Sequence, residues 1–348
     1  MLIFWMDDEP SFPLGGPWAE AFNQALPNTN VQLEVIVVSD DDLRCIEAKF
    51  DDARTRLGTP NLVLMDHNLT RANLGFQASG SSLSHMIRTQ HPAIAVACLT
   101  AEATDLEGLD FEQKSEYVAV YTKDGLQNNL EEIVVLARDY RKLCNEDGRI
   151  LGREAILNLL QAPPPDKEHL DYVLPPEFSK APAGEGNAPL QTPHMLARWI
   201  LGGLLSRPGY IVDADEVSTM LGLRIGSEHL WSELLANARY RGVFATDSSP
   251  KWWMSQLAQK VFEASKDPDA PSLQLAGRRL PGITEEDYSR SDFGSASDPP
   301  PDCLAFTDVK MGKRIQTYRS QTREFFGRRG SLPGFSPYLI ATRPRRDS

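Results

Sequence analysis

The amino-acid sequence predicts an α/β protein, in which a doubly wound sheet of five parallel strands precedes a mainly helical second domain. Three observations lead to this fold class. A chain of 348 residues is long enough for about two domains. Short apolar runs alternate with stretches of helical periodicity as far as residue 143. After residue 193, apolar residues recur mostly at helical spacing.

The first half contains five strand-like runs interleaved with helical stretches. The runs are short, almost wholly apolar and bounded by polar residues, as expected for strands buried on both faces of a parallel sheet. Asp40 or Asp41 is a suitable N-cap for the second helix. We predict strands at residues 2–6, 31–38, 61–65, 93–99 and 117–121, and helices at residues 18–25, 41–57, 81–89, 111–115 and 126–143.

The composition is that of a soluble globular protein, with 41% hydrophobic residues. No apolar run approaches the roughly 18 residues that a membrane span needs, so we expect no membrane partner. The four cysteines are far apart and form no CxxC pair, which disfavours a zinc site or a disulfide framework. This cysteine usage fits a reducing compartment, and we expect a cytoplasmic protein.

Charge is unevenly distributed along the chain. The formal net charge of −12 lies entirely in residues 1–150, whereas residues 151–348 sum to zero. Within the neutral half, residues 303–348 hold ten basic residues and three acidic ones. This basic segment could bind nucleic acid or pack on the acidic half, and its apolar residues favour packing.

Chemically active side chains stand directly after four of the five predicted strands. Asp7 and Asp8 follow the first strand, and Asp66 follows the third. Thr100 ends the fourth, and Lys123 comes after the fifth. The carboxyl ends of parallel strands meet at one edge of a sheet, where such folds place their sites. Clustered carboxylates need a cation, and an all-oxygen set suits Mg²⁺ with a phosphoryl partner, so the pattern predicts phosphoryl transfer to a carboxylate.

These residues and their surroundings resemble the receiver domain of two-component response regulators, the CheY-like family. The resemblance covers residues 1–143 and rests on the strings FWMDDEP at the first strand, LVLMDHNL around Asp66, ACLTAEA around Thr100, and Gly80 with SSLSHMIR. It implies a phosphoprotein of signal transduction, to which a histidine kinase or a phosphotransfer protein passes a phosphoryl group. It also implies Mg²⁺ as the cofactor.

The resemblance implies a role for each residue of the set. Asp66 is the implied phosphoacceptor and forms the catalytic set together with Thr100 and Lys123. Thr100 is expected to hydrogen-bond a phosphoryl oxygen, and Lys123 to pair with the phosphoryl group. The implied metal ligands are Asp8 directly, Asp7 mostly through water, Asp66, and the backbone carbonyl of Asn68.

Several positions depart from the family pattern. Asp124 stands where the family has a proline after the lysine, and Thr70 replaces another usual proline. Val120 occupies the place of the switch residue, which is often aromatic, while Tyr121 is one residue further on. We therefore expect intact phosphorylation chemistry with a remodelled signalling face, read mainly through Thr100. Tyr121 should point to the opposite side of its strand from Val120.

The sequence predicts three segments: a receiver domain at residues 1–145, a linker at residues 146–193 and an output domain at residues 194–348. The stretch 162–193 is rich in proline, which is typical of a stiff connection rather than of regular structure. In the output domain, Asp213 or Asp215 is a suitable cap for a short helix. We predict helices at residues 194–207, up to residue 221 after that cap, at 228–239 and at 250–264.

Three kinds of output stay open. We favour a module that docks a protein partner, and a homodimer is one form this could take. A winged-helix DNA-binding regulator would use residues 228–239 as recognition helix and residues 241–244 as wing. Glu228, Glu233 and the neutral second half disfavour DNA as the partner. An enzymatic output is the third alternative, although no HExxH, P-loop or GxSxG motif is present, and we expect no enzyme.

Overall fold

The computed structural model describes residues 1–9, 16–26, 28–38, 41–69, 79–100, 111–145, 149–175, 193–206, 209–265, 267, 270, 272–289, 303–308 and 313–318. Two compact units make up the chain. The first comprises residues 1–160 and 174–201, and the second comprises residues 161–173 and 202–348.

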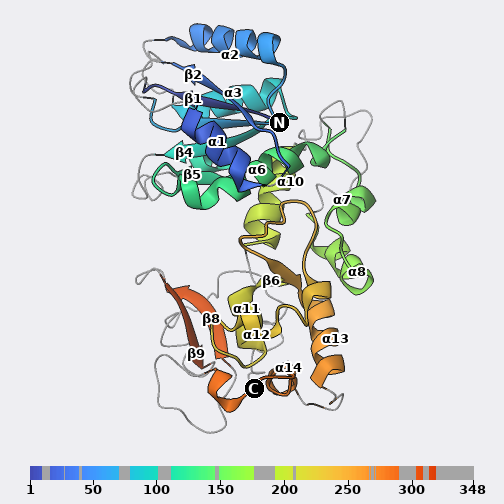
Figure 1. The fold of residues 1–348 in the computed structure, drawn as a ribbon. Coiled ribbons are helices and arrows are strands. Elements are labelled where there is room, and N and C mark those ends of the chain that lie inside the picture. The colour runs from blue at the N-terminus through green and yellow to red at the C-terminus, as the bar shows by residue number, and fades with distance from the viewer. Residues whose placement is uncertain are drawn as a thin grey trace, which may run out of the picture. The chain divides into compact units, whose positions relative to one another are not determined.

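The first unit is built on a five-stranded sheet of order β2-β1-β3-β4-β5, in which every neighbouring pair is parallel (Figure 1). This is the doubly wound order of flavodoxin-like folds, and it confirms the predicted sheet. The strands are β1 (Leu2–Asp7), β2 (Gln32–Val37), β3 (Leu62–Asp66), β4 (Ala95–Thr100) and β5 (Val120–Thr122).

Helices cover both faces of this sheet. Trp5 packs against Trp18 of α1, with ring centroids 6.2 Å apart, whereas the neighbouring Phe4 meets Phe50 of α2 at 5.7 Å. Successive side chains of a strand point to opposite faces, so α1 and α2 lie on different sides of the sheet. The helices are α1 (Gly16–Ala25), α2 (Leu43–Leu57), α3 (Gly80–Gln90), α5 (Phe111–Ser115) and α6 (Leu130–Asp139).

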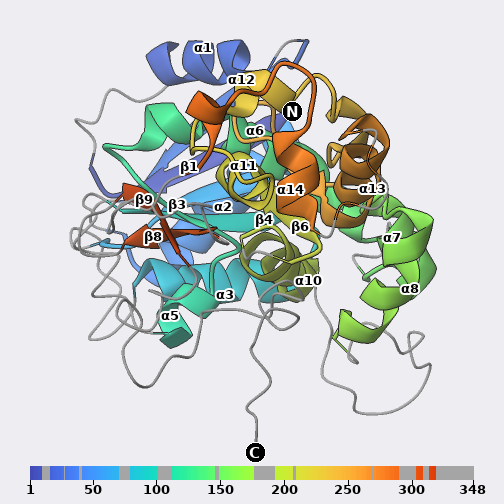
Figure 2. The same ribbon diagram turned by 90° about the horizontal axis from the view of Figure 1, so that it is seen from below.

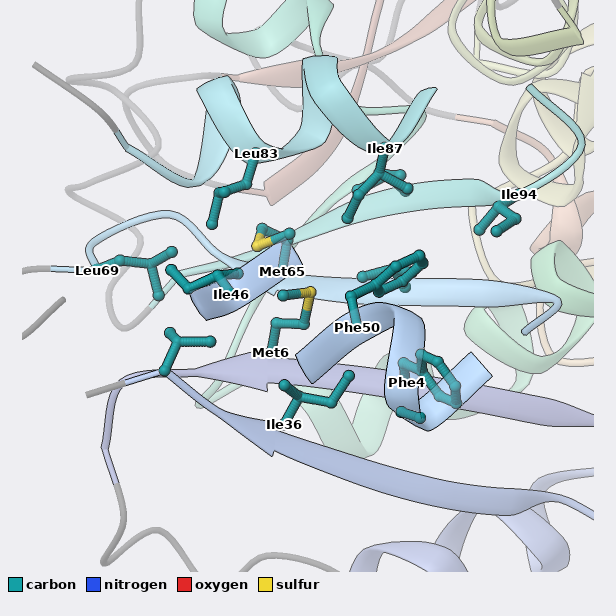
Figure 3. Close-up of a cluster of buried hydrophobic side chains, with 14 of the residues drawn as sticks. Phe4, Met6, Ile36, Ile46, Phe50, Met65, Leu69, Leu83, Ile87 and Ile94 are labelled. Carbon is teal, nitrogen blue, oxygen red and sulfur yellow. The ribbon is translucent and has the colours of Figure 1, made fainter. Parts of the chain in front are cut away.

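The core on the α2 side shows why these residues form these elements. Phe4 and Met6 of β1 meet Met65 of β3 from the sheet, and Phe50 and Ile87 reach them from α2 and α3 (Figure 3). The strands alternate and the helices repeat every three to four residues, so each contributes one apolar stripe to the same layer. In this layer, Met6 and Met65 directly precede the last residues of β1 and β3.

Some predicted boundaries need correction in the first unit. The N-cap of α2 is Asp42, whose side chain accepts a hydrogen bond from Cys45 N, rather than Asp40 or Asp41. The fifth strand begins at Val120, not at residue 117. The helix expected at 126–143 consists of α6 between two short 3-10 turns, η1 (Leu126–Asn129) and η2 (Tyr140–Leu143).

The predicted linker contains regular structure, contrary to our prediction. Helix α8 spans Pro164–Val173 within the proline-rich stretch, and α7 spans Arg153–Leu159 before it. Pro164 and Pro165 fit the first turn of α8, where a backbone N–H has no helical partner to lose. Residues 176–192 of the predicted linker lie outside the described residues.

The helix predicted at 194–207 also differs. An α-helix, α10, spans Pro193–Arg198, and the chain continues as a π-helix, η3, over Trp199–Leu204. Gly202 and Gly203 lie in this π stretch, and glycine is a poor α-helix former that tolerates the wider turn. The first unit ends at Leu201, so the π-helix carries the chain into the second unit.

The second unit is mainly helical and also contains two antiparallel sheets of two strands each. In Figure 2 the strands β8 and β9 lie side by side. Residues 319–348, which hold much of the basic segment, lie outside the described residues. The elements are β6 (Ile211–Asp213), α11 (Ala214–Met220), α12 (Glu228–Trp231), η4 (Ala236–Ala238), β7 (Lys251–Trp253), α13 (Met254–Ser265), α14 (Leu273–Arg278), η5 (Glu285–Asp287), β8 (Cys303–Asp308) and β9 (Lys313–Tyr318).

Two predicted helices of the second unit are wrong in part. Residues 228–239 form only the four-residue α12 and a later 3-10 turn, so the expected recognition helix is not continuous. The helix ends early because of contacts with a distant segment. Arg239 forms a β-bridge with Trp252, and Tyr240 N donates a hydrogen bond to Lys251 O at 2.7 Å, so the backbone is extended at these two residues. Residues 251–253 are strand β7, and the last predicted helix begins only at Met254.

Tryptophans organise the core of the second unit. Trp252 packs edge-on against Trp231 at 4.9 Å, while Trp253 meets Tyr240 at 5.6 Å. Because Trp252 and Trp253 are neighbours on β7, these contacts lie on opposite faces of the strand. Asp213 caps α11 in a capping box with Glu216, as the sequence predicted. No helix among the described residues is both long and apolar enough to cross a bilayer.

Candidate functional site

The sheet brings the predicted site residues to one edge. Asp7 is the last residue of β1, Asp66 the last of β3 and Thr100 the last of β4, and these strands are neighbours. Asp8 and Lys123 follow β1 and β5 directly. The convergence predicted from the order of strands therefore exists, because in-register parallel strands end at a common level.

Three carboxylates form a buried cluster at this edge. Asp7, Asp8 and Asp66 each place a carboxylate oxygen within 4.8 Å of the others. Their exposed fractions are 0%, 5% and 5%. Three like charges this close and this shielded from water repel one another unless a cation lies among them.

Lys123 supplies one such cation. Its Nζ lies 2.7 Å from Asp7 Oδ2 and 2.7 Å from Asp66 Oδ2. Burial lowers the pKa of Lys123, but its hydrogen bonds to Asp66 and Asp7 outweigh this, so the pKa is raised overall. The amine is therefore held in its charged form between two acids.

The pKa of Asp66 is raised despite the nearby ammonium. Burial is the largest cause, and the negative charge of Asp7 adds to it, while the hydrogen bonds from Lys123 and Asn68 act in the opposite direction. In its ionised form, a carboxylate stripped of water is a stronger nucleophile than a hydrated one.

Backbone and indole groups orient the two acids that Lys123 binds. Asp7 accepts hydrogen bonds from Trp5 Nε1 at 3.3 Å and from Glu9 N at 2.9 Å. Asp66 accepts one from Asn68 N at 3.1 Å. These hydrogen bonds fix the side chains of Asp7 and Asp66. The bond from Asn68 N also places Asn68 beside the Asp66 carboxylate. The backbone carbonyl of Asn68 is the group that we expected to bind a metal ion.

Thr100 and the fifth strand complete the edge. Thr100 is fully buried, and its carbonyl accepts a hydrogen bond from Lys123 N at 2.7 Å. Val120 packs against the core on the α2 side, and the buried Tyr121 is not part of that core. The two residues thus point to opposite sides of β5, as predicted.

Two features of the site were missed at the sequence level. His67, next to Asp66, is buried, and its Nδ1 lies 3.1 Å from the hydroxyl of Tyr117. Gly80 N donates to His67 O at 3.0 Å, and a Cβ on Gly80 would lie 2.1 Å from Asp66 O. Only glycine fits at this close approach of α3 to the acidic edge.

Comparison with known proteins gives matches to solved structures alone. No protein-family model matches the chain, and no curated protein does. The chain is similar to NtrX from Brucella abortus (18% identity, TM-score 0.30), covering 51% of this chain and 34% of that one. It therefore spans about a third of that longer protein.

Two single-domain structures are covered almost completely. One is the receiver domain of NtrX from Brucella abortus, with 18% identity and a TM-score of 0.28; the match covers 39% of this chain and 96% of that one. The other is a response regulator receiver domain protein from Clostridium thermocellum, with 18% identity and a TM-score of 0.29; the match covers 41% of this chain and 97% of that one. Two of these three structures are described as receiver domains, and the third is the longer NtrX. The fold itself, a doubly wound parallel sheet of order β2-β1-β3-β4-β5, is read from the strand pairing.

Proposed function

We propose that the protein is a cytoplasmic response regulator of a two-component phosphorelay, in which a histidine kinase or a phosphotransfer protein phosphorylates Asp66. The observation that carries this proposal is the buried acidic cluster in which Asp7 and Asp66 both lie 2.7 Å from Lys123 Nζ. Such a pocket offers a nucleophilic carboxylate beside a fixed positive charge, which acceptance of a phosphoryl group requires.

The side chains of the edge divide the reaction among them. A carboxylate oxygen of Asp66 attacks phosphorus, so that a P–O bond forms while the P–N bond to the donor imidazole breaks. Lys123 then pairs with the transferred phosphoryl oxygens, and the hydroxyl of Thr100 hydrogen-bonds one of them. The burial of Asp66 and Thr100 keeps bulk water from the acyl phosphate.

The donor set fits Mg²⁺, because the three carboxylates are hard oxygen ligands that lie close together. Asp8 would bind the ion directly, Asp7 mostly through water, and Asn68 through its backbone carbonyl. When bound, Mg²⁺ neutralises the acidic pocket and the phosphoryl oxygens.

We further propose that residues 194–348 form the output module, behind a receiver at residues 1–145 and a connection at 146–193. This module acts by contact with a protein partner and has no enzymatic activity in this proposal. The zero net charge of residues 151–348 supports a protein partner over DNA, and so does the short α12 where a recognition helix would be needed.

The phosphoacceptor is tested by incubating the protein with Mg²⁺ and a small phosphodonor or beryllofluoride. Intact mass and fluorine NMR should reveal an adduct that Asp66→Asn abolishes without loss of the fold. Asp52→Asn, which changes an exposed carboxylate of α2, should keep it. An adduct that persists in Asp66→Asn contradicts the assignment.

The output is tested by comparing assembly with and without beryllofluoride. Sedimentation of the full chain with candidate proteins should show a complex that changes with the adduct. Tight DNA retention that falls steeply with salt would instead establish a DNA-binding output.

A further inference from the structure

Three consecutive residues, beginning with the last residue of α5, join three separate parts of the first unit. The hydroxyl of Tyr117 lies 3.1 Å from Nδ1 of His67, the residue after Asp66. Ser84 of α3 donates to the carbonyl of Glu116 at 2.6 Å. His194 of α10 donates from Nε2 to the carbonyl of Ser115 at 2.8 Å. The segment Ser115–Tyr117 thus touches the phosphoacceptor loop, α3 and α10.

The two end contacts of this segment are shielded from water. Tyr117 is 1% exposed, His67 7% and His194 2%. A buried polar group that loses its partner is not rescued by solvent, so each bond strongly constrains the groups that it joins. Nδ1 of His194 has no hydrogen-bond partner among the described residues, which leaves Ser115 as the group that holds the ring.

Contacts with α3 make the segment stiff. The carboxylate of Glu116 forms an ion pair with Arg88 and lies 3.2 Å from His85 Nδ1, both on α3. The first residue of α3, Gly80, is bonded to His67. α3 therefore holds the middle of the segment in place, while the Tyr117 hydroxyl is the side-chain group that joins the segment to the His67 ring.

We propose that this segment couples Asp66 to α10, with His67, Tyr117 and His194 as positioning residues. The inference rests on the proposed function and names the route by which phosphorylation is transmitted. Phosphorylation of Asp66 displaces the adjoining His67; Tyr117 and the backbone to Ser115 follow, and the hydrogen bond to His194 carries the change into α10. From α10 the chain passes through the π-helix into the second unit.

This route replaces the one that Val120 cannot provide, because a valine side chain has no hydrogen-bonding group. Tyr117 supplies a hydroxyl three residues earlier, and its partner His67 is covalently joined to the phosphoacceptor. Coupling through packed and hydrogen-bonded groups requires a demonstration of energetic dependence, not proximity alone.

The test uses the full chain with Mg²⁺ and beryllofluoride, and measures hydrogen exchange of peptides covering residues 193–204. In the wild type, the adduct should change exchange in α10 and the π-helix several-fold. Tyr117→Phe keeps the ring and removes the hydroxyl; it should still bind beryllofluoride but lose the change in α10. Tyr240→Phe is the matched control, because it removes a buried hydroxyl bonded to Val243 O at 2.7 Å in the second unit.

A second pair of variants tests the far end of the route and stands even if Tyr117→Phe does not fold. His194→Gln retains an N–H donor for Ser115 and should keep the response, whereas His194→Leu should lose it. A response of α10 that survives in Tyr117→Phe or in His194→Leu overturns the inference. The inference is also overturned if the wild type binds beryllofluoride and exchange in α10 does not change. That result would leave the proposed function standing. Absence of the fluorine signal of bound beryllofluoride overturns both.

Discussion

Lys123 is the residue that decides the charge of the site. Its ammonium bridges Asp7 and Asp66, and would compete with a divalent ion for the same carboxylates. We expect Lys123→Met to tighten Mg²⁺ binding by about thirtyfold, since the repulsion between a single and a double positive charge ~4 Å apart is about 2 kcal/mol even in bulk water. Titration calorimetry measures the affinity. Lys49→Met, on the exposed side of α2, should leave it unchanged; weaker binding in Lys123→Met would contradict this prediction.

The two neighbouring aspartates should differ in their contribution to metal binding. Asp7 is already engaged by Lys123, Trp5 and the backbone of Glu9. Asp8 is the proposed direct ligand, so Asp8→Asn should weaken Mg²⁺ binding by more than about tenfold, or ~1.4 kcal/mol. Asp7→Asn should weaken binding less and lower the thermal midpoint more. The same calorimetric titration, with thermal unfolding followed by circular dichroism, checks both; a reversed order would assign the direct ligand to Asp7.

The position of these residues, though not their roles, could be predicted from sequence because it depends on strand order alone. Asp7, Asp66 and Thr100 end neighbouring strands, so any correct strand assignment brings them together. The bond from His67 to Tyr117 joins residues 50 positions apart through side chains. Its existence depends on the path of the chain after α5, which no local pattern encodes.

Among the elements, α3 shows how closely a helix can approach the site. A methyl group at Gly80 would lie 2.1 Å from Asp66 O and 2.9 Å from the Tyr117 hydroxyl. The first of these is backbone and cannot move aside, so Gly80→Ala should destabilise the first unit by about 3 kcal/mol. Chemical denaturation measures the loss. Gly152→Ala is the control, because nothing lies within 4 Å of its added Cβ, and an equal effect in both would refute the steric argument.

Elements of strong local pattern were predictable, and elements fixed by distant contacts were not. The five strands and α2, α3 and α6 follow apolar periodicity, and the capping box at Asp213 marks the start of α11. Residues 251–253 look helical by sequence but form β7, because they pair with Ile211–Asp213. The packing of Trp252 and Trp253 on the two faces of a strand stabilises the fold more than one additional turn of helix would.

Across the whole molecule, the docking of α10 should make stability depend on pH. Burial is the main cause that lowers the pKa of His194 to about 3, and the nearby Arg88 adds to it. The unfolded chain binds a proton at this residue near pH 6.5, whereas the folded chain does not, so the stabilisation is complete above pH 6.5 and is lost as the pH falls toward 3.

The comparison of wild type with His194→Gln isolates this contribution. Between pH 7 and pH 5 the wild type should lose about 2 kcal/mol more unfolding free energy than the variant, from 1.36 kcal/mol per pH unit. Urea denaturation at both pH values provides the measurement. His229→Gln, an exposed histidine of α12, should behave as the wild type. Equal slopes for wild type and His194→Gln would show that the ring is accessible to protons.

The organisation into units was harder to predict than the fold of the first half. Proline content suggested a boundary, yet α8 belongs to the second unit while the later α10 belongs to the first. The chain therefore passes between the units more than once. The path of the chain is determined by which apolar faces pack against each other. Amino-acid composition along the chain carries little information about that packing.

The acidic cluster also determines the net charge of the pocket before and after phosphorylation. Three ionised carboxylates and one ammonium give the pocket a formal charge of minus two, which one divalent ion would cancel. Conversion of Asp66 to an acyl phosphate replaces one negative charge by about two, so the modified pocket holds an excess of roughly one negative charge. The phosphorylated protein should therefore retain its metal more tightly than the resting protein, and chelators should strip the ion from it more slowly.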